Sequence, residues 1–217
     1  MPSNGASGLT RTKGAIQMTQ FETVQDDSAR GLLSFWFEEL AFDDWFIQKD
    51  DVDARLQSRF GHLVDEAEAG KLDYWRDHPL PMLALILVLD QLPRNLFRGS
   101  ARAFVLDDRA LAAARQYLDQ FHDAFMGLSA QQKLFVLLPF EHAEDMAAQE
   151  TCVGMFEQLA PSIDPADAEF WANTTEYARR HLEPISLFGR FPHRNQVLGR
   201  ETTAAEAAWL AQHPDGF

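Results

Sequence analysis

The spacing of apolar residues predicts helices along nearly the whole chain. Ser28, a residue type that favours helix N-caps, precedes an apolar face formed by Leu32, Leu33, Trp36, Phe37 and Leu40. The segment 51–69 carries a second apolar face at the same spacing, and the glycine after it is typical of a helix end. Both segments are therefore predicted to be amphipathic helices.

Proline and capping residues mark five further helices. Pro79 and Pro81 introduce a helix over 82–92 that is apolar nearly all round, which indicates a central position. The others are predicted at 108–120, from Ser129 to about 159 with an interruption or kink at Pro139, from Asp164 past Pro184 toward 189, and from Thr203 to about 213. No segment alternates long enough to predict a strand. The pattern predicts an all-α domain over residues 28–217, with about seven helices stacked as antiparallel hairpins.

The N-terminal residues differ in composition from the rest of the chain. Residues 1–17 are rich in Ser, Gly and Thr and lack the apolar stretch of a secretory signal. We therefore expect residues 1–27 to form a disordered tail, with Met18 an alternative start to Met1. The longest apolar run, Met82 to Leu89, is far shorter than the roughly 20 residues of a membrane span.

Charge and cysteine content narrow the class of protein. The chain has 19 Lys and Arg against 33 Asp and Glu, a formal charge of −14, which argues against nucleic-acid and anionic-membrane partners. Cys152 is the only cysteine, so an internal disulfide is excluded and a reducing compartment is favoured. We expect a cytoplasmic protein.

The first segment with unusual chemistry runs from Leu89 to Gly99. Asp90 ends a fully apolar helix, where an unpaired negative charge would be costly. Pro93 predicts that the chain turns out of the core there, and Arg94 or Arg98 is the expected partner of Asp90. The pair either fixes the turn or forms the floor of a pocket.

The second segment runs from Leu138 to Gln149. If it is helical throughout, one narrow inward stripe contains Leu138, His142, Asp145, Gln149, Cys152 and Phe156. Buried polar groups need partners, so the stripe predicts an internal structural network or a polar ligand pocket. Glu141, His142 and Asp145 are candidate acid/base groups; a metal site is a third alternative, but the His-Glu-x-x-His pattern is absent.

The third segment, residues 179–200, is basic in an acidic chain. It holds five arginines and two histidines against Glu183 as its one acid. Guanidinium groups suit carboxylate or phosphate ligands, but pairing with the acidic second segment would also explain them. Its sequence Pro192-His193-Arg194-Asn195, with Gly199-Arg200, echoes Pro93-Arg94-Asn95 with Arg98-Gly99, which leaves internal duplication open.

Together these segments resemble a bacterial domain family of unknown function, with relatives in some eukaryotes, assigned to the tetratricopeptide-like all-α superfamily. The resemblance covers about residues 30–212 and rests on the motifs Leu33-Ser34-Phe35-Trp36-Phe37, Trp45-Phe46, Arg59-Phe60-Gly61, Leu89-Asp90-Gln91-Leu92-Pro93-Arg94-Asn95, Leu138-Pro139-Phe140-Glu141-His142-Ala143-Glu144-Asp145, Phe188-Gly189-Arg190-Phe191-Pro192-His193-Arg194-Asn195 and Leu198-Gly199-Arg200. Leu92 stands where we expect phenylalanine, and Cys152 where serine is more frequent. The resemblance implies a tetratricopeptide-like fold and no established activity.

Two hypotheses for function follow, beside a purely structural role for the polar segments. The first is a pocket between 141–149 and 190–195 for an anionic small molecule, with acid/base hydrolysis or isomerisation as its chemistry and no cofactor assigned. Its candidate catalytic residues are Glu141, His142, Asp145 and His193, of which His142 or His193 would transfer protons and Glu141 or Asp145 would orient the histidine. Its candidate ligand-binding residues are Asp90, Arg94, Asn95, Arg98, Gln149, Arg190, Arg194, Asn195 and Arg200.

The second hypothesis is a helical scaffold that binds a protein or peptide, which rests on analogy with tetratricopeptide-like folds. Its candidate anchors are Trp45, Phe46, Trp75 and Trp171. Homodimer formation is a further hypothesis. An enclosed pocket with hydrogen-bonded acids and bases favours the enzyme, and an exposed groove favours the scaffold.

Overall fold

The computed structural model describes residues 20–214 and residue 216, and in these residues it contains helices and no strand. Its α-helices are α1 (Asp27–Ser34), α2 (Phe42–Phe46), α3 (Asp50–Glu68), α4 (Pro79–Ile86), α5 (Leu92–Leu96), α6 (Asp107–Gln120), α7 (His122–Gly127), α8 (Ala130–Glu141), α9 (Met146–Leu159), α10 (Ala168–Phe188) and α11 (Ala204–Leu210). The all-α prediction is confirmed. The predicted number of helices is too low, because α2, α5 and α7 are helices of five or six residues without a readable apolar period.

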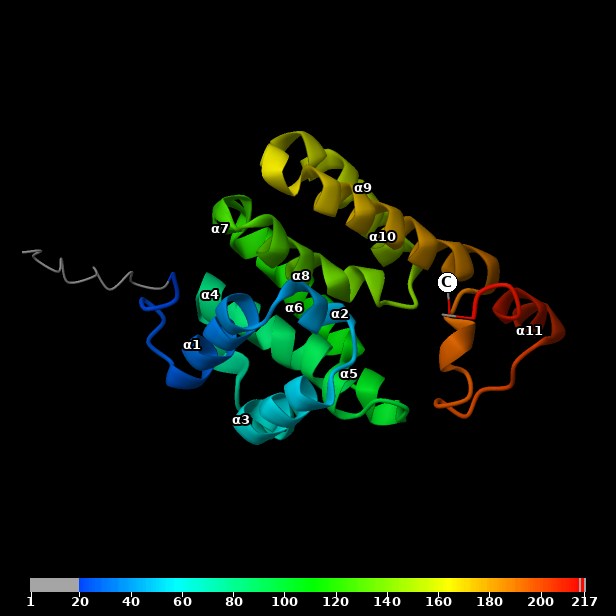
Figure 1. The fold of residues 1–217 in the computed structure, drawn as a ribbon, viewed down its shortest axis with the longest axis horizontal. Helices are drawn as coiled ribbons and strands as arrows, with labels where there is room; N and C mark the ends of the chain where they lie inside the picture. Colours follow the sequence, from blue (N-terminus) through cyan, green and yellow to red (C-terminus); the bar gives the residue numbers. More distant parts are fainter. Residues whose placement is uncertain (1–19, 215, 217) are drawn as a thin grey trace, which may run out of the picture.

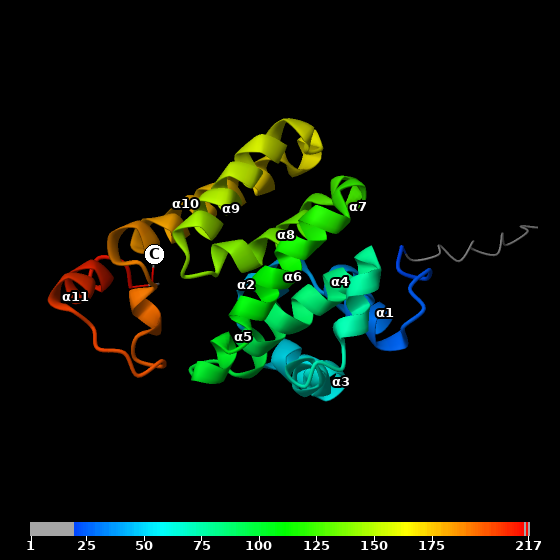
Figure 2. The ribbon, with the colours of Figure 1, turned by 180° about the vertical axis from the view of Figure 1, so that it is seen from behind.

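The helices lie in layers. α9 and α10 pack side by side at one face, α4, α6 and α8 form the middle, and α3 with α5 covers the opposite face (Figures 1 and 2). α1 lies at one end of the molecule, and α11 with the C-terminal segment lies at the other (Figure 1). The site described below uses α2, α5, α8 and α10, which come from different layers.

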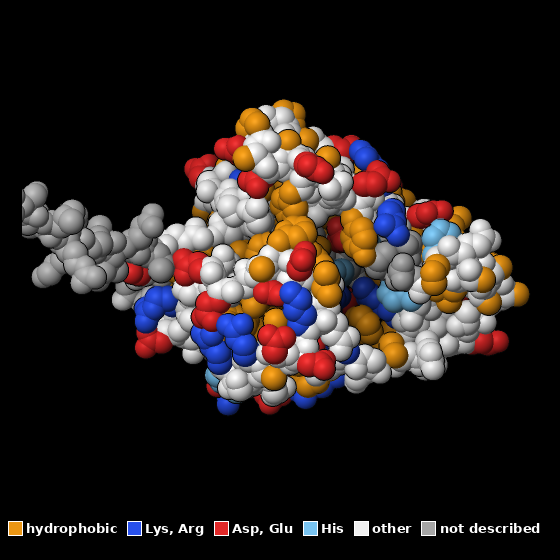
Figure 3. All heavy atoms as spheres, in the orientation of Figure 1, with side chains coloured by type: hydrophobic (Ala, Val, Ile, Leu, Met, Phe, Trp, Pro, Cys, Tyr) orange, Lys and Arg blue, Asp and Glu red, His pale blue; other side chains and the backbone are white. Residues whose placement is uncertain are grey.

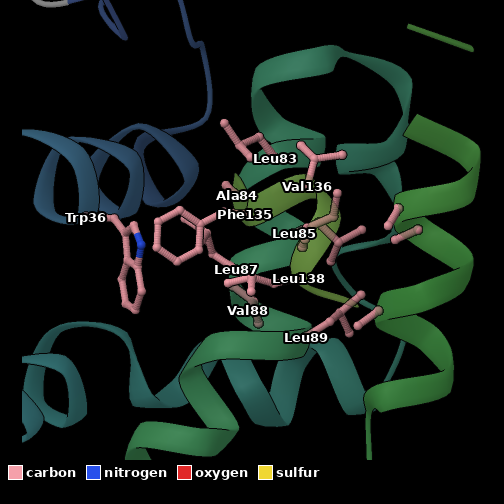
Figure 4. Packing of buried hydrophobic residues seen from close by; sticks show 14 of the residues in the cluster. Trp36, Leu83, Ala84, Leu85, Leu87, Val88, Leu89, Phe135, Val136 and Leu138 are labelled. Atoms are coloured by element: carbon pink, nitrogen blue, oxygen red, sulfur yellow. The ribbon is translucent and has the colours of Figure 1, made fainter. Parts of the chain in front are cut away.

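The centre of the core is α4, as its apolar sequence predicts. The side chains from Met82 to Leu89 are fully buried, and α8 packs against them. Trp36 meets Phe135 edge to face with ring centroids 5.5 Å apart, which joins the first helical segment to α8 (Figure 4). Trp75 and Trp171 are each 1% exposed, so their prediction as exposed anchors is wrong and both belong to the core.

The N-terminal boundary differs in detail from the expected one. The N-cap of α1 is Asp26, whose side chain accepts the Ala29 N–H at 2.9 Å, and not Ser28. Phe21 and Val24, which fall in the expected tail, are buried against the core. The predictions for residues 1–17 and Met18 lie outside the described residues.

Two helices, α1 and α4, each continue into a π-helical turn. α1 continues as a π turn over Phe35–Glu39, and α4 continues through a π turn over Leu87–Gln91 into α5. The Leu92 N–H bonds to the Leu87 carbonyl oxygen, and this wider turn lets the helix continue through Pro93 to Leu96. The predicted exit from the core at Pro93 is therefore wrong.

The helical segment predicted from Ser129 to 159 is interrupted, but at residues 142–145 and not at Pro139. α8 passes through Pro139 and ends at Glu141, and α9 begins at Met146 with Asp145 as its N-cap. The Asp145 carboxylate accepts the Ala148 N–H at 2.7 Å. The break removes the single polar stripe that the sequence predicted across this segment.

No helix in the described part of the chain is long and apolar enough to cross a membrane.

The start of α8 offers a direct test of the capping assignment. The Gln132 N–H donates to Ser129 Oγ at 3.2 Å, and the Ser129 N–H donates to Gln132 Oε1 at 3.0 Å. Ser129→Ala is expected to lower the free energy of unfolding by about 1 kcal/mol because one N-terminal donor of α8 loses its partner. Urea denaturation measures it; Ser58→Ala, on the exposed face of α3, is the control, and an equal loss there would contradict the assignment.

Candidate functional site

Asp90 is a buried carboxylate held by the wide turn between α4 and α5. It is 1% exposed and lies in the π turn Leu87–Gln91, a distortion that is frequent at functional sites. Its oxygens accept from Gln91 Nε2 at 2.6 Å and from His142 Nδ1 at 2.8 Å, and Arg94 Nη1 lies 3.1 Å away. Although burial raises the pKa of the Asp90 carboxyl, the charge of Arg94 and the hydrogen bond from His142 hold it well below its usual range.

His142 lies directly after the last residue of α8 and faces Asp90. Because the Asp90 carboxylate only accepts, the proton of the neutral imidazole is on Nδ1, and Nε2 carries the free lone pair. Burial, followed by the positive charge of Arg94, lowers the pKa of His142. The sequence predicted Glu141 or Asp145 as the group that orients this histidine; in the structure it is Asp90.

Asp107 joins two arginines at the edge of this site. Arg94 binds both of its oxygens at 2.9 Å, and Arg194 Nη1 lies 3.1 Å from Oδ2. The Arg194 guanidinium also lies between the rings of Phe104 and Phe191, 4.6 and 4.4 Å from their centroids. This network ties the C-terminal segment to α5 and α6.

The two echoed motifs share their local geometry. Arg94 and Arg194 meet at Asp107, although one is in α5 and the other in the 3-10 turn Pro192–Arg194. Arg98 donates to Asn95 Oδ1 at 2.6 Å, and Arg200 donates to Asn195 Oδ1 at 3.0 Å. Gly99 and Gly199 both have a positive φ, of 71° and 64°, which glycine adopts without strain. The echo in the sequence thus corresponds to two similar arginine–asparagine turns.

Glu141 and His181 form a second buried acid–imidazole contact. Glu141 is 2% exposed, and its Oε1 lies 3.3 Å from His181 Nδ1. That nitrogen also donates to the Tyr177 carbonyl oxygen at 3.0 Å. Burial, with the negative charge of Asp90 added, raises the pKa of Glu141 to about 8, and burial lowers the pKa of His181 well below its usual value.

A pocket of about 580 Å³ opens onto these groups, a volume suited to a small organic molecule. Its polar lining is Gln91, Arg94, Asn95, Arg98, Glu141, His142, Asn173, Thr174, Tyr177 and His181, and its apolar lining is Phe42, Trp45, Phe46, Leu134, Leu138 and Phe170. In the hollow beside α10, Figure 3 shows hydrophobic side chains next to histidine and basic side chains. The pocket is therefore amphipathic.

The structure brings six of the predicted site residues together. Arg94, Asn95, Arg98, Glu141 and His142 line the pocket, and Asp90 lies behind His142. Arg98 does not pair with Asp90; it binds Asp53 at 3.2 Å, and Arg94 is the partner. The pocket lies among α2, α5, α8 and α10 rather than beside the 190–195 loop.

The other predicted residues lie elsewhere, mostly in contacts that join helices. Asp145 is half-exposed at the start of α9, and Gln149 donates to the carbonyl oxygens of Glu141 and Ala143. Arg190 binds Glu206, and Arg200 binds Glu144, which also accepts the Phe191 N–H.

His193 and Asn195 complete the C-terminal segment. His193 Nδ1 lies 3.3 Å from the Gly216 carbonyl oxygen, and burial lowers the pKa of His193 to about 4. Asn195 is fully buried and donates to Thr202 Oγ1. Pairing between the basic third segment and the acidic second segment is thus confirmed for Arg200, whereas Arg194 and Arg190 have other partners.

Sequence reasoning missed part of the pocket. Gln91, Tyr177 and His181 line the pocket, although the sequence pattern assigned no role to any of them. Tyr177 and His181 are four residues apart on α10, as are Phe170 and Thr174, so all four share a face. That spacing was the available signal.

The described residues contain no group of three His, Cys, Asp or Glu side chains placed to hold one metal ion.

The fold and the site define an all-helical protein with a buried carboxylate–histidine pair at an amphipathic pocket. The chain belongs to the family described as "Bacterial protein of unknown function (DUF924)", whose model matches residues 32–214. A solved structure of a protein of unknown function from Agrobacterium tumefaciens is similar, with a TM-score of 0.73 and 33% identity over 85% of this chain and 97% of that one. No curated protein matches. The resemblance to a bacterial family of unknown function is confirmed, and its assignment to the tetratricopeptide-like superfamily stays a prediction.

Proposed function

We propose that the pocket binds a small organic molecule and that His142 accepts a proton from it or from a water beside it. The observation that carries this proposal is the pair formed by Asp90 and His142 in the wall of a 580 Å³ pocket. A carboxylate on Nδ1 fixes the tautomer and stabilises the imidazolium that forms when Nε2 takes a proton.

This chemistry suits hydrolysis by an activated water or isomerisation through removal of a carbon-bound proton. Both reactions need a neutral imidazole, and the lowered pKa of His142 keeps the ring neutral near pH 7. His193, the other candidate base, lies outside the lining of this pocket.

A protein- or peptide-binding scaffold is the second candidate, and one observation favours it. Phe42, Phe46 and Ile47 of the α2 segment are each more than half exposed beside the pocket. Clustered exposed aromatic residues are typical of binding surfaces. With this candidate function we also propose that the helix pairs stack as in tetratricopeptide-like proteins, that the protein is cytoplasmic and that it forms a homodimer.

A ligand screen tests the small-molecule proposal. A set of neutral, anionic and cationic aryl compounds is screened by ligand-observed NMR, and binders are titrated against variants. We expect at least one compound to lose about tenfold in affinity with Phe46→Ala, at the pocket rim, because the contact of its ring is removed.

The matched control is Leu187→Ala, which shortens an equally exposed apolar side chain on α10 away from the pocket lining. Compounds that bind the wild type are expected to bind Leu187→Ala with unchanged affinity. If no compound shows binding that depends on Phe46, the small-molecule proposal is wrong.

A further inference from the structure

Both arginines in the described lining of the pocket are already paired with carboxylates. Arg94 binds Asp90 and both oxygens of Asp107, and Arg98 binds both oxygens of Asp53. Arg98 also donates to Asn95. Each guanidinium keeps further N–H donors, but its charge is already balanced, so a bound anion would share the arginine with an aspartate and be repelled by that carboxylate.

Glu141 differs from these arginines because no permanently charged side chain of the described residues is paired with it. It lines the pocket, and its side chain is only 2% exposed. No Lys or Arg of the described residues lies within 4.0 Å of its carboxyl group. Its ionic contact is His181, whose Nδ1–H is directed to the Tyr177 carbonyl oxygen. A cation placed next to Glu141 would supply the charge that the protein does not.

Aromatic rings form much of the remaining lining. Trp45 is fixed because its indole N–H donates to the Trp36 carbonyl oxygen at 2.9 Å. The Phe42 ring meets Phe170 edge to face at 5.6 Å, which joins α2 to α10 across the pocket, and Tyr177 lines it from α10. Aromatic faces attract organic cations and also pack against flat apolar bodies.

We infer that the ligand is an organic amine with an aromatic body, whose ammonium group binds the Glu141 carboxylate while its ring lies among the side chains of α2 and α10. Since burial keeps a proton on Glu141 at neutral pH, binding of the ammonium releases that proton to water. The ammonium then donates charge-assisted hydrogen bonds to the carboxylate, and desolvation in the pocket strengthens them. This assignment rests on the proposed function and adds the charge of the ligand, which the sequence had suggested to be negative.

Three ligands with one ring system test the charge. Tryptamine, tryptophol and indole-3-propionate carry an ammonium, a hydroxyl and a carboxylate on the same indole. Calorimetric titration of the full chain is expected to give tryptamine at least tenfold higher affinity than indole-3-propionate. Glu141→Gln is expected to weaken tryptamine about tenfold and to leave tryptophol unchanged, and Glu150→Gln, an exposed change on α9, should alter neither.

The other outcomes overturn the inference in distinct ways. If indole-3-propionate binds as tightly as tryptamine, and with the same dependence on Phe46, the ligand is not a cation but the small-molecule site stands. If tryptamine binds equally well to Glu141→Gln, its ammonium is not held by Glu141. If none of the three binds, the aryl-amine class is wrong, and the broader screen decides the proposed function separately.

Discussion

Replacing Asp107 by alanine is expected to lower the free energy of unfolding by about 3–5 kcal/mol, because it leaves two largely buried guanidinium groups without a shared partner. The side chains of Arg94 and Arg194 are 16% and 7% exposed, so water does not replace the lost carboxylate. For a chain of this size the melting temperature should fall by about 10 °C. Differential scanning calorimetry and urea denaturation measure both quantities.

Asp108→Ala is the matched control for this experiment. Asp107 and Asp108 both lie in the first turn of α6, where a negative charge interacts favourably with the helix dipole, but Asp108 is exposed. The control is expected to lose less than about 1 kcal/mol. Equal losses in the two variants would mean that the dipole, and not the pairing with Arg94 and Arg194, accounts for the stability.

Local signals in the sequence predicted the local parts of the fold. The capping boxes at Ser129 and Thr203, the prolines in the first turn of α4 and the glycine after α10 act within four residues, so their structural consequences can be read from the sequence alone. The sequence left Arg94 and Arg98 open as partners of Asp90, and the helix that continues through Pro93 places Arg94, four residues on, beside it.

The break between α8 and α9 shows where that method fails. Helical spacing placed His142, Asp145 and Gln149 on one predicted stripe, and this outweighed the N-cap preference of Asp145. The cap is in fact the stronger signal, because Asp145 bonds the Ala148 N–H and starts a new helix. Gln149 then bonds back to the end of α8 instead of facing the pocket.

The site itself depends on contacts that span the chain. His142 reaches Asp90 across 52 residues, and Arg194 reaches Asp107 across 87. Hydrophobic periodicity gives the face of a residue on its own helix, but it does not give the helix that packs against that face. For this reason the sequence identified much of the polar chemistry and placed the pocket beside the wrong segment.

Glu141→Gln is expected to make the protein more stable than the wild type as the pH rises, since burial holds the pKa of Glu141 near 8 in the folded state while the unfolded carboxyl titrates near its usual 4.5. Below pH 4.5 both states carry the proton. Between pH 4.5 and 8 the unfolded wild-type chain loses its proton first, so the stability of the folded wild type falls by about 1.4 kcal/mol per pH unit. Glutamine does not titrate and avoids this loss.

Urea denaturation at pH 5, 6, 7 and 8 measures the effect. The difference in stability between Glu141→Gln and the wild type should grow by about 4 kcal/mol over this range, whereas Glu150→Gln, exposed on α9, should change it by less than about 1 kcal/mol. A difference that stays constant with pH would show that Glu141 ionises in the fold as it does in the unfolded chain. Growth of the difference would show that the chain keeps an acid at a cost to stability, which is typical of a group retained for binding and supports Glu141 as the anchor for a cationic ligand.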